Sequence, residues 1–331
     1  MPANLTPQYL EAEAKFRAAE TTEEKLEALD EMMAVIPKHK GTEKMRADIK
    51  RRIAKLRQKD KSAGSAKKGL EYNIQKEGAG QVVIAGPPNS GKSLIVRRMT
   101  AAEPEVADYP FTTRHPVSGM MEYEDILVQL VDTPPISEDM TEPWVIAISR
   151  AAEAVAIVLD LAGGTILDDI ENVKSELIRG KVRLIAPGQD PPVGEYPAGT
   201  VFRPAIIVAN KLDQPGAEES LAVFHELYNS ELPVIPVSAL TGEGLEDLKR
   251  QLFELLGIVR VYTKIPGKPP DYNRPFVLKK GSTVADLAAS VHKEFVYKLR
   301  FARAWGKGKP DGMMAGRDQE LEDKDIIELH V

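Results

Sequence analysis

The sequence contains no cysteine, which excludes disulfide bonds and thiolate metal sites and leaves the redox compartment unmarked by thiols. It also has no apolar run close to the roughly 18 residues that a membrane-spanning helix needs. The N-terminal stretch MPANLTPQYLEAEAK has neither a basic n-region nor an apolar h-region, so we expect no secretory signal. These absences favour a cytoplasmic protein that makes no membrane contact.

The composition fits a chain of two or three folded domains. Of its 331 residues, 43% are hydrophobic and 28% are charged, which is enough to form a buried core beneath a polar surface. The formal net charge of −6 is unevenly distributed: residues 1–68 carry a net +5, residues 69–258 a net −15 and residues 259–331 a net +4. An acidic centre with basic ends indicates that the terminal segments contact a polyanion.

Residues 1–69 are predicted to form an N-terminal helical hairpin followed by a linker. Apolar residues at helical spacing, with Thr22 and Glu24 near the start, predict a helix within residues 7–36. A second helix is predicted over residues 43–59, and the stretch 41–68 holds eleven positive and three negative side chains. Such a helix either presents an ordinary solvated face or binds RNA, and RNA binding would weaken steeply with salt.

The stretch QVVIAGPPNSGKS organises the centre of the chain. A short apolar strand is followed by the G-x-x-x-x-G-K-[ST] pattern and then by a helix, which is the arrangement of a phosphate-binding loop. The glycines let consecutive backbone N–H groups point at phosphate oxygens, Lys92 would contact the β- and γ-phosphates, and Ser93 would ligate Mg²⁺. A plain Gly/Pro turn is the alternative. The candidate phosphate-binding residues are Gly86, Pro87, Pro88, Asn89, Ser90, Gly91, Lys92, Ser93 and Leu94.

The tetrapeptide Asn210-Lys211-Leu212-Asp213 selects the base. The Asp213 carboxylate can accept hydrogen bonds from guanine N1–H and the 2-amino group, whereas adenine lacks this pair of donors. Lys211 would lie along the base, and Asn210 would tie this loop to the phosphate loop. The motif Ser238-Ala239-Leu240 follows another apolar strand, where the Ala239 N–H would donate to guanine O6. A simple helix cap explains this second motif almost equally well.

Two further positions are candidates for Mg²⁺ binding. Asp132 closes the apolar strand ILVQLV and is the carboxylate expected to hold Mg²⁺ through water. Thr113, which we prefer over Thr112, supplies a hydroxyl that can ligate Mg²⁺ when a γ-phosphate is present. Arg114 and His115 follow directly and are more simply explained as a solvated pair. Lys92, Thr113 and Asn89 are the candidate catalytic residues.

Alternating strand and helix patterns over residues 70–258 predict an α/β domain with a mostly parallel sheet covered by helices on both faces. The predicted strands are 82–85, 126–131, 154–159, 205–209 and 234–237, and the predicted helices are 93–101, 142–152, 166–178, 221–228 and 245–256. Residues 186–200 are too rich in proline and glycine for either and form a loop insertion. Residues 259–331 predict a small domain with strands at 259–264, 276–279, 301–305 and 326–330 and a helix at 284–295.

Taken in order, GPPNSGKS, DYPFTTRHPVSG, VDTPP, NKLD and VSAL resemble the Obg superfamily of GTPases, and most of all the developmentally regulated GTP-binding (DRG) proteins. The segment GTEKMRADIKRRIAKLR is similar to the basic helix ahead of their G domain. Residues 259–331 are similar to their C-terminal TGS domain, a β-grasp module. The resemblance implies a Ras-like P-loop G domain over 70–258, GTP hydrolysis to GDP with Mg²⁺, and work near ribosomes or RNA.

Three departures from that family pattern bear on activity. Pro135 stands where the D-x-x-G motif has a glycine whose N–H contacts the γ-phosphate, and proline has no N–H. Ile136 stands where Ras-type enzymes carry a water-orienting glutamine, so unaided hydrolysis should be on the order of 10⁻³ s⁻¹ or slower. Asn89 matches an asparagine that helps to hold K⁺ in related GTPases, although it could equally stabilise the turn. The domain that DRG proteins insert within the G domain is missing between Asp132 and Asp160.

The sequence therefore leaves two functions in competition. The first is a slow ribosome- or RNA-associated regulatory GTPase that uses residues 41–68 and 259–331 to dock, and the second is a guanine-nucleotide-dependent binding module with little or no hydrolysis. Pro134-Pro135 favours the second. Whether an accessory protein takes part is left open. Aromatic and basic side chains alternate around Phe295, Tyr297, Phe301 and Trp305, a pattern that suits single-stranded RNA, although most of these rings should belong to the β-grasp core.

Overall fold

The structure of the chain is a computed structural model that describes residues 8, 12, 15–16, 22–36, 49–50, 74–100, 105–106, 117–137, 141–228 and 231–331. The chain forms two compact units, Met1–Tyr72 and Asn73–Val331. In the first unit, Leu29 and Met32 of helix α2 (Thr22–Val35) are buried together with Ile36 and Ile49. Most of the predicted basic helix 43–59, and all of the linker, lie outside the described residues.

The described strands of the second unit include a large mixed sheet in the order β2-β3-β4-β1-β5-β7-β6, with β8 also paired to β7. Strand β1 is parallel to β4 and β5, strand β7 is parallel to β5, β6 and β8, and β3 is antiparallel to β4. Because parallel central strands are buried on both faces, they read as unbroken apolar runs. The strands are β1 (Gln81–Ala85), β2 (Glu105–Val106), β3 (Val117–Tyr123), β4 (Ile126–Asp132), β5 (Ala154–Asp160), β6 (Val182–Ile185), β7 (Val201–Asn210) and β8 (Val234–Pro236).

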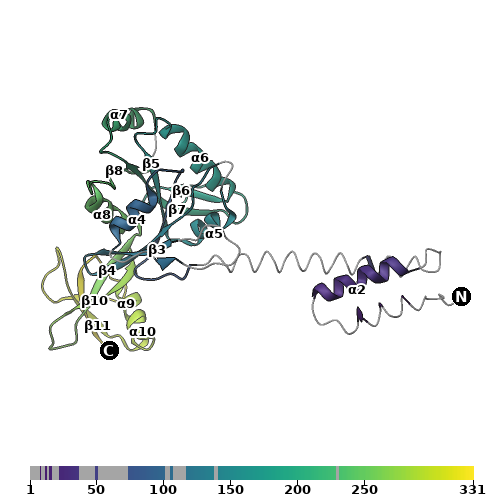
Figure 1. Ribbon diagram of the computed structural model, residues 1–331. Coiled ribbons are helices and arrows are strands. Elements are labelled where there is room, and N and C mark those ends of the chain that lie inside the picture. Colours follow the sequence, from purple (N-terminus) through teal and green to yellow (C-terminus); the bar gives the residue numbers. More distant parts are fainter. Residues whose placement is uncertain are drawn as a thin grey trace. The chain divides into compact units, whose positions relative to one another are not determined.

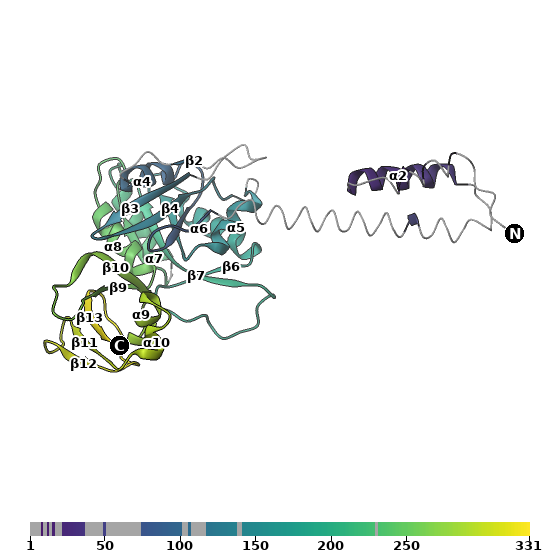
Figure 2. The same cartoon turned by 90° about the horizontal axis from the view of Figure 1, so that it is seen from below.

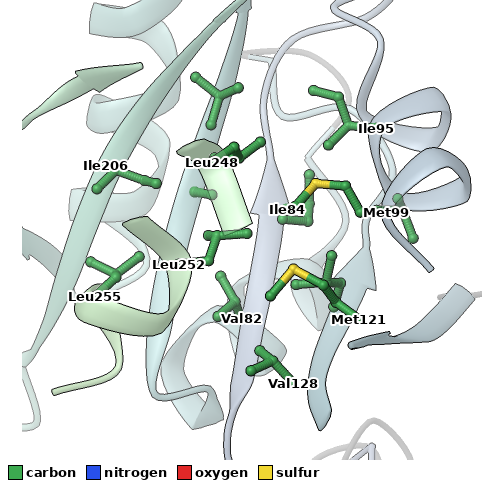
Figure 3. Close-up of a cluster of buried hydrophobic side chains, with 14 of the residues drawn as sticks. Val82, Ile84, Ile95, Met99, Met121, Val128, Ile206, Leu248, Leu252 and Leu255 are labelled. Atoms are coloured by element: carbon green, nitrogen blue, oxygen red, sulfur yellow. The ribbon is translucent and has the colours of Figure 1, made fainter. Parts of the chain in front are cut away.

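Helices cover both faces of this sheet, as Figure 1 shows. They are α4 (Lys92–Met99), α5 (Pro143–Ala151), α6 (Ile166–Arg179), α7 (Ala217–Leu227) and α8 (Leu245–Leu255). One buried cluster joins alternate residues of the central strands, such as Val82 and Ile84, to α4 and α8. In the view of Figure 3, Leu248 and Leu252 of α8 lie to the left of Ile84, and Met99 of α4 lies to its right in the same cluster.

The C-terminal part of this unit forms a second, smaller mixed sheet in the order β10-β9-β13-β11-β12 (Figure 2). Its strands β9 and β13 are parallel, and the other pairs are antiparallel. Thr283 and Asp286 form a capping box at the start of α9, whose Val284, Leu287 and Ala288 enter the core of this sheet. The elements are β9 (Ile258–Thr263), β10 (Asp271–Lys279), α9 (Val284–Val291), α10 (Phe295–Lys298), β11 (Phe301–Trp305), β12 (Met313–Ala315) and β13 (Asp325–His330).

The predicted α/β fold with a second, smaller sheet is confirmed, but several elements differ from their predicted bounds. The helix predicted over 284–295 ends at Val291, because His292 is extended and its N–H closes the last turn on Ala288. Strands β2, β3, β6 and β12 were not predicted, since each is short or broken by glycine or polar residues and gains its stability from pairing. The predicted helix 221–228 already begins at Ala217, after Gly216 at a φ of 79°.

The loop over residues 186–200 contains neither helix nor strand, as predicted, and it connects the neighbouring strands β6 and β7. Among the described helices, none combines the length and apolar character needed to cross a lipid bilayer. The parallel pairing of β1, β4, β5, β7 and β8 places their carboxyl ends at one edge of the large sheet, where ligands of open α/β sheets bind.

Candidate nucleotide site

The phosphate loop connects β1 to α4 at this edge and requires its glycines. Gly86 and Gly91 have φ angles of 151° and 93°. A Cβ atom at Gly86 would lie 2.3 Å from the Val158 carbonyl oxygen, and one at Gly91 would lie 2.2 Å from Nδ2 of Asn210. Helix α4 then starts at Lys92 without a side-chain cap, so its first N–H groups and its dipole face the loop. This is the geometry of an anion site.

Lys92 lies inside the loop and is only 6% exposed. Its Nζ donates to the carbonyl oxygens of Gly86 at 3.1 Å and Pro87 at 2.8 Å. Burial lowers the pKa of Lys92 to about 8, against the opposing effect of the nearby Asp132 carboxylate. The ammonium group is therefore short of counter-charge, a deficit that phosphate oxygens would correct.

Ser93 and Asp132 meet across the site, although they come from α4 and β4. The Ser93 hydroxyl donates to Oδ2 of Asp132 at 2.5 Å. The other carboxylate oxygen, Oδ1, is buried and has no hydrogen-bond partner among the described residues. Burial raises the pKa of Asp132, and the Ser93 hydrogen bond and the Lys92 charge oppose that rise. The Ser93 hydroxyl and the Asp132 carboxylate, whose Oδ1 is unsatisfied, are adjacent oxygen ligands that suit a hard cation such as Mg²⁺.

Asn210 joins three segments of this edge. At the end of β7 it is buried, its Nδ2 donates to the Ser90 carbonyl oxygen at 2.8 Å, and its Oδ1 accepts from the Ala239 N–H at 3.0 Å. The phosphate loop is thereby bonded to the loop after β7 and to the loop after β8. The Ala239 N–H that we predicted for guanine O6 is already engaged here, so a base would have to share it with Asn210 or replace Asn210.

Asp213 presents an ionised carboxylate in the loop after β7, which we call the base loop (residues 210–213). Ser238 Oγ donates to its Oδ1 at 2.5 Å, and Gln214 Nε2 donates to its Oδ2 at 2.7 Å. These hydrogen bonds, that of Ser238 foremost, hold the pKa of Asp213 below its ordinary value. A carboxylate oxygen accepts more than one hydrogen bond, so both oxygens retain capacity for the two guanine donors.

Two side chains that contact the predicted residues, Asp160 and Arg98, were not identified from the sequence. Lys211, at a φ of 69°, pairs its Nζ with Oδ2 of Asp160 at 2.5 Å. Arg98 of α4 donates to the Leu240 carbonyl oxygen at 2.8 Å, while the Leu240 side chain is largely exposed. Asp160 could have been identified from the sequence, because it is a carboxylate at the end of the buried strand β5. Nothing in the local sequence indicated Arg98.

The segment after Asp132 stays against the phosphate loop. Thr133 donates to the Ile84 carbonyl oxygen through both its N–H and its hydroxyl, and the Ile136 N–H donates to the Gly86 carbonyl oxygen at 3.0 Å. Ile136 is 1% exposed, so its side chain is directed into the protein rather than toward a nucleotide. A cavity of about 440 Å³ lies between the phosphate loop and the segment after β4, and it is lined by Asn89, Gly91, Lys92, Ser93, Leu94, Asp132, Thr133, Pro134 and Pro135.

The predicted residues that the structure describes gather at this one edge of the sheet. Pro87 and Ser90 are buried in the phosphate loop, Pro88 and Asn89 are exposed on it, and Asn89 has a φ of 59°. Thr112, Thr113, Arg114 and His115 lie outside the described residues, so the Mg²⁺ ligand expected from Thr113 stays a prediction.

Comparison with known proteins agrees with this geometry. A family model described as 50S ribosome-binding GTPase matches residues 81–186, and a TGS domain model matches residues 259–331. Developmentally-regulated GTP-binding protein 1 of Xenopus laevis is 29% identical over 90% of this chain and 95% of its own length. The chain belongs to the Obg/DRG family of GTPases. It is a GTP-binding protein with a G domain and a C-terminal TGS domain.

Two further comparisons, with a yeast relative and with a solved structure, agree with this DRG-family assignment. Ribosome-interacting GTPase 1 of Saccharomyces cerevisiae is 28% identical over 93% of this chain and 99% of its own length. The alignments with the Xenopus and yeast proteins run over 356 and 369 positions, more than the 331 residues here, so both relatives contain residues without a counterpart. The crystal structure of a GTP-binding protein from Pyrococcus horikoshii shares the fold, with a TM-score of 0.50 and 17% identity over 76% of this chain and 99% of that one.

Proposed function

We propose that this GTP-binding protein holds GTP or GDP with Mg²⁺ at the carboxyl edge of the large sheet, hydrolyses GTP slowly and acts on a ribosome- or RNA-containing partner. The observation that carries the proposal is the Asn210 bridge to Ser90 and Ala239. This bridge holds the phosphate loop and the base loops in one fixed arrangement, so a guanosine phosphate can bind at both ends without first ordering either loop.

Each side chain has a separate part in this proposal. Lys92 would leave the Gly86 and Pro87 carbonyl oxygens for the β- and γ-phosphates, and the N–H groups at the start of α4 would bind the same phosphates. Ser93 and Asp132 would hold Mg²⁺, which supplies positive charge that stabilises the phosphoryl group during transfer. Asp213 would read the guanine edge. Asn89 lines the cavity and is the proposed contact for K⁺.

Two observations support a low rate of hydrolysis. Ile136 is buried and bonded through its N–H to Gly86, so no side chain at this position orients a water molecule. Pro135 lines the cavity and has no N–H for the γ-phosphate. The same observations support the alternative function, a guanine-nucleotide-dependent binding module that cleaves little or no GTP.

Single-turnover hydrolysis of GTP separates these two functions. We expect a rate on the order of 10⁻³ s⁻¹ or slower in Na⁺, because the usual water-orienting group is missing, and a faster rate in K⁺ if Asn89 holds that ion. Each salt should be tested with and without ribosomes, since the yeast relative is named as ribosome-interacting. Release of no phosphate under any of these conditions would exclude the GTPase function and leave the binding module.

Pro135→Gly tests the role of the proline pair. The glycine supplies an N–H on the cavity wall, and one hydrogen bond to a charged phosphate is worth about 1.5–3 kcal/mol. We therefore expect the affinity for a non-hydrolysable GTP analogue, relative to GDP, to rise by about tenfold or more. Pro134→Gly is the matched control, because it loosens the same loop while placing its N–H one residue earlier. An unchanged affinity ratio in Pro135→Gly would refute this role for the missing N–H.

A further inference from the structure

The TGS domain contacts the G domain at the tip of the β3–β4 hairpin. Arg260 of β9 is 2% exposed although it carries a full charge. Its Nη1 donates to Glu124 and, at 2.8 Å, to Oδ1 of Asp125, the two residues of the turn between β3 and β4. On the TGS side, its Nη2 donates to Oδ2 of Asp323 at 2.6 Å and its Nε to Oδ1 at 3.0 Å. A single guanidinium group thus joins the two domains.

Rings from the G domain enclose the same guanidinium. It lies 4.7 Å from the ring centre of Phe253 in α8 and 5.8 Å from that of Tyr123 in β3, and these two rings stack on each other at 5.0 Å. A planar guanidinium combines bidentate hydrogen bonding with stacking in a way that a lysine ammonium does not. The contact is consequently fixed in orientation as well as in distance.

Two TGS side chains add to this contact. The Tyr262 hydroxyl donates to Oδ2 of Asp125 at 2.5 Å, and Lys324 pairs with Glu124 at 2.9 Å. Hydrogen bonds from Lys324 and Arg260 lower the pKa of Glu124. Burial raises the pKa of Asp125, but the hydrogen bonds that it accepts from Tyr262 and Arg260 outweigh this effect, so its pKa is lowered as well. Both carboxylates are therefore ionised at neutral pH. We call Arg260, Tyr262, Glu124 and Asp125 the hairpin clamp.

The hairpin connects the clamp to the Mg²⁺ ligand without interruption. Strands β3 and β4 pair residue by residue from Tyr123↔Ile126 at the tip to Val117↔Asp132 at the far end, with no bulge. At about 3.4 Å per residue this ladder is roughly 20 Å long. Its far end is Asp132, which bonds to Ser93. A displacement at the tip is transmitted along a regular ladder, because sliding one strand would break every backbone hydrogen bond in it.

We propose that the hairpin clamp is a positioning contact through which the TGS domain controls the nucleotide site. The proposal rests on the function proposed above. Arg260 and Tyr262 hold the tip, the β3–β4 ladder keeps its register, and Asp132 is thereby held at the distance from Ser93 at which both can bind Mg²⁺. A partner that moves the TGS domain would release the tip and loosen the nucleotide. Coupling is reciprocal, so the bound nucleotide also changes the strength of the clamp.

Asp125→Asn tests the clamp from the side of the G domain. It removes one charge at the tip and leaves the Arg260–Asp323 pair of the TGS domain intact. We expect release of GDP in Mg²⁺ to become at least fivefold faster, the lower end of typical coupling between sites. Because the clamp acts through Asp132 and Mg²⁺, release in excess EDTA should be equal for the variant and the wild type. Tyr262→Phe, which removes only the hydroxyl, should give a smaller change in the same direction.

Asp247→Asn is the matched control, since it breaks an exposed arginine–carboxylate pair with Arg250 within α8 that includes none of the clamp residues. Hydrogen exchange of residues 117–132 and 258–263 gives a readout that is independent of turnover. We expect faster exchange in Asp125→Asn than in the wild type. In the wild type, we expect the exchange rates to differ between the GDP and the GTP-analogue states. Tyr262→Phe decides the test if Asp125→Asn does not fold. Unchanged GDP release, or equal acceleration in EDTA, overturns the clamp. A wild type that binds no guanine nucleotide overturns the proposed function, and this inference with it.

Discussion

Asp213→Asn is expected to lower the affinity for GDP by about two to four orders of magnitude. The wild-type carboxylate is ionised and accepts from Ser238 and Gln214 while keeping capacity for guanine N1–H and the 2-amino group. Asparagine replaces one acceptor with an N–H donor that would face one of the guanine donors. One charged hydrogen bond is lost and a donor is left unpaired, each at a cost of about 1.5–3 kcal/mol.

Calorimetric titration with GDP, ADP and xanthosine diphosphate checks this prediction. The xanthine 2-carbonyl oxygen accepts where guanine donates, so Asp213→Asn should prefer the xanthine nucleotide over GDP. Asp168→Asn, an exposed carboxylate in the first turn of α6, is the matched control and should bind GDP like the wild type. If the wild type binds ADP as tightly as GDP, or the variant keeps full GDP affinity, Asp213 does not read the base.

Lys92→Met is expected to reduce the affinity for GTP by about 100-fold. The ammonium group is held at the phosphate loop by the Gly86 and Pro87 carbonyl oxygens, and its hydrogen bonds to phosphate oxygens would be charge-assisted. Methionine keeps much of the length and the packing of the side chain but donates nothing. Thermal unfolding without nucleotide is the control, because the variant should be at least as stable as the wild type once a buried charge is removed.

The pH dependence of binding reports the same group. In the free protein burial lowers the pKa of Lys92 to about 8, and bound phosphates would raise it again, so binding takes up a proton near that pH. The affinity for GTP should have its full value well below pH 8, where Lys92 is protonated. It should fall by about tenfold between pH 7 and pH 9. Lys92→Arg stays charged over this range, so its affinity, although lower, should show no such fall. A wild-type profile parallel to that of Lys92→Arg would contradict the lowered pKa.

The sequence by itself determined the elements that local chemistry specifies. The apolar runs of β1 and β5 predicted central strands because a strand buried on both faces consists almost entirely of apolar residues. The loop from Gly86 to Ser93 was recognisable because only glycine adopts such φ angles without strain while backbone approaches closely. The prediction that Asp213 reads guanine follows from the donors of the base alone. In each case the physical requirement falls on a few consecutive residues.

Tertiary structure alone decided the contacts between residues that are distant in the chain. Strand β3 carries a glycine and polar residues and is a strand because it pairs with β4. The sequence predicted that Asn210 contacts the phosphate loop, but its hydrogen bond with Ala239 in the loop after β8 was found only in the folded chain. Arg260 reads as one more charged residue of a strand, yet it is buried between Glu124, Asp125 and Asp323. A buried charge is tolerated only where partners from several elements converge, and that convergence is a property of the folded chain.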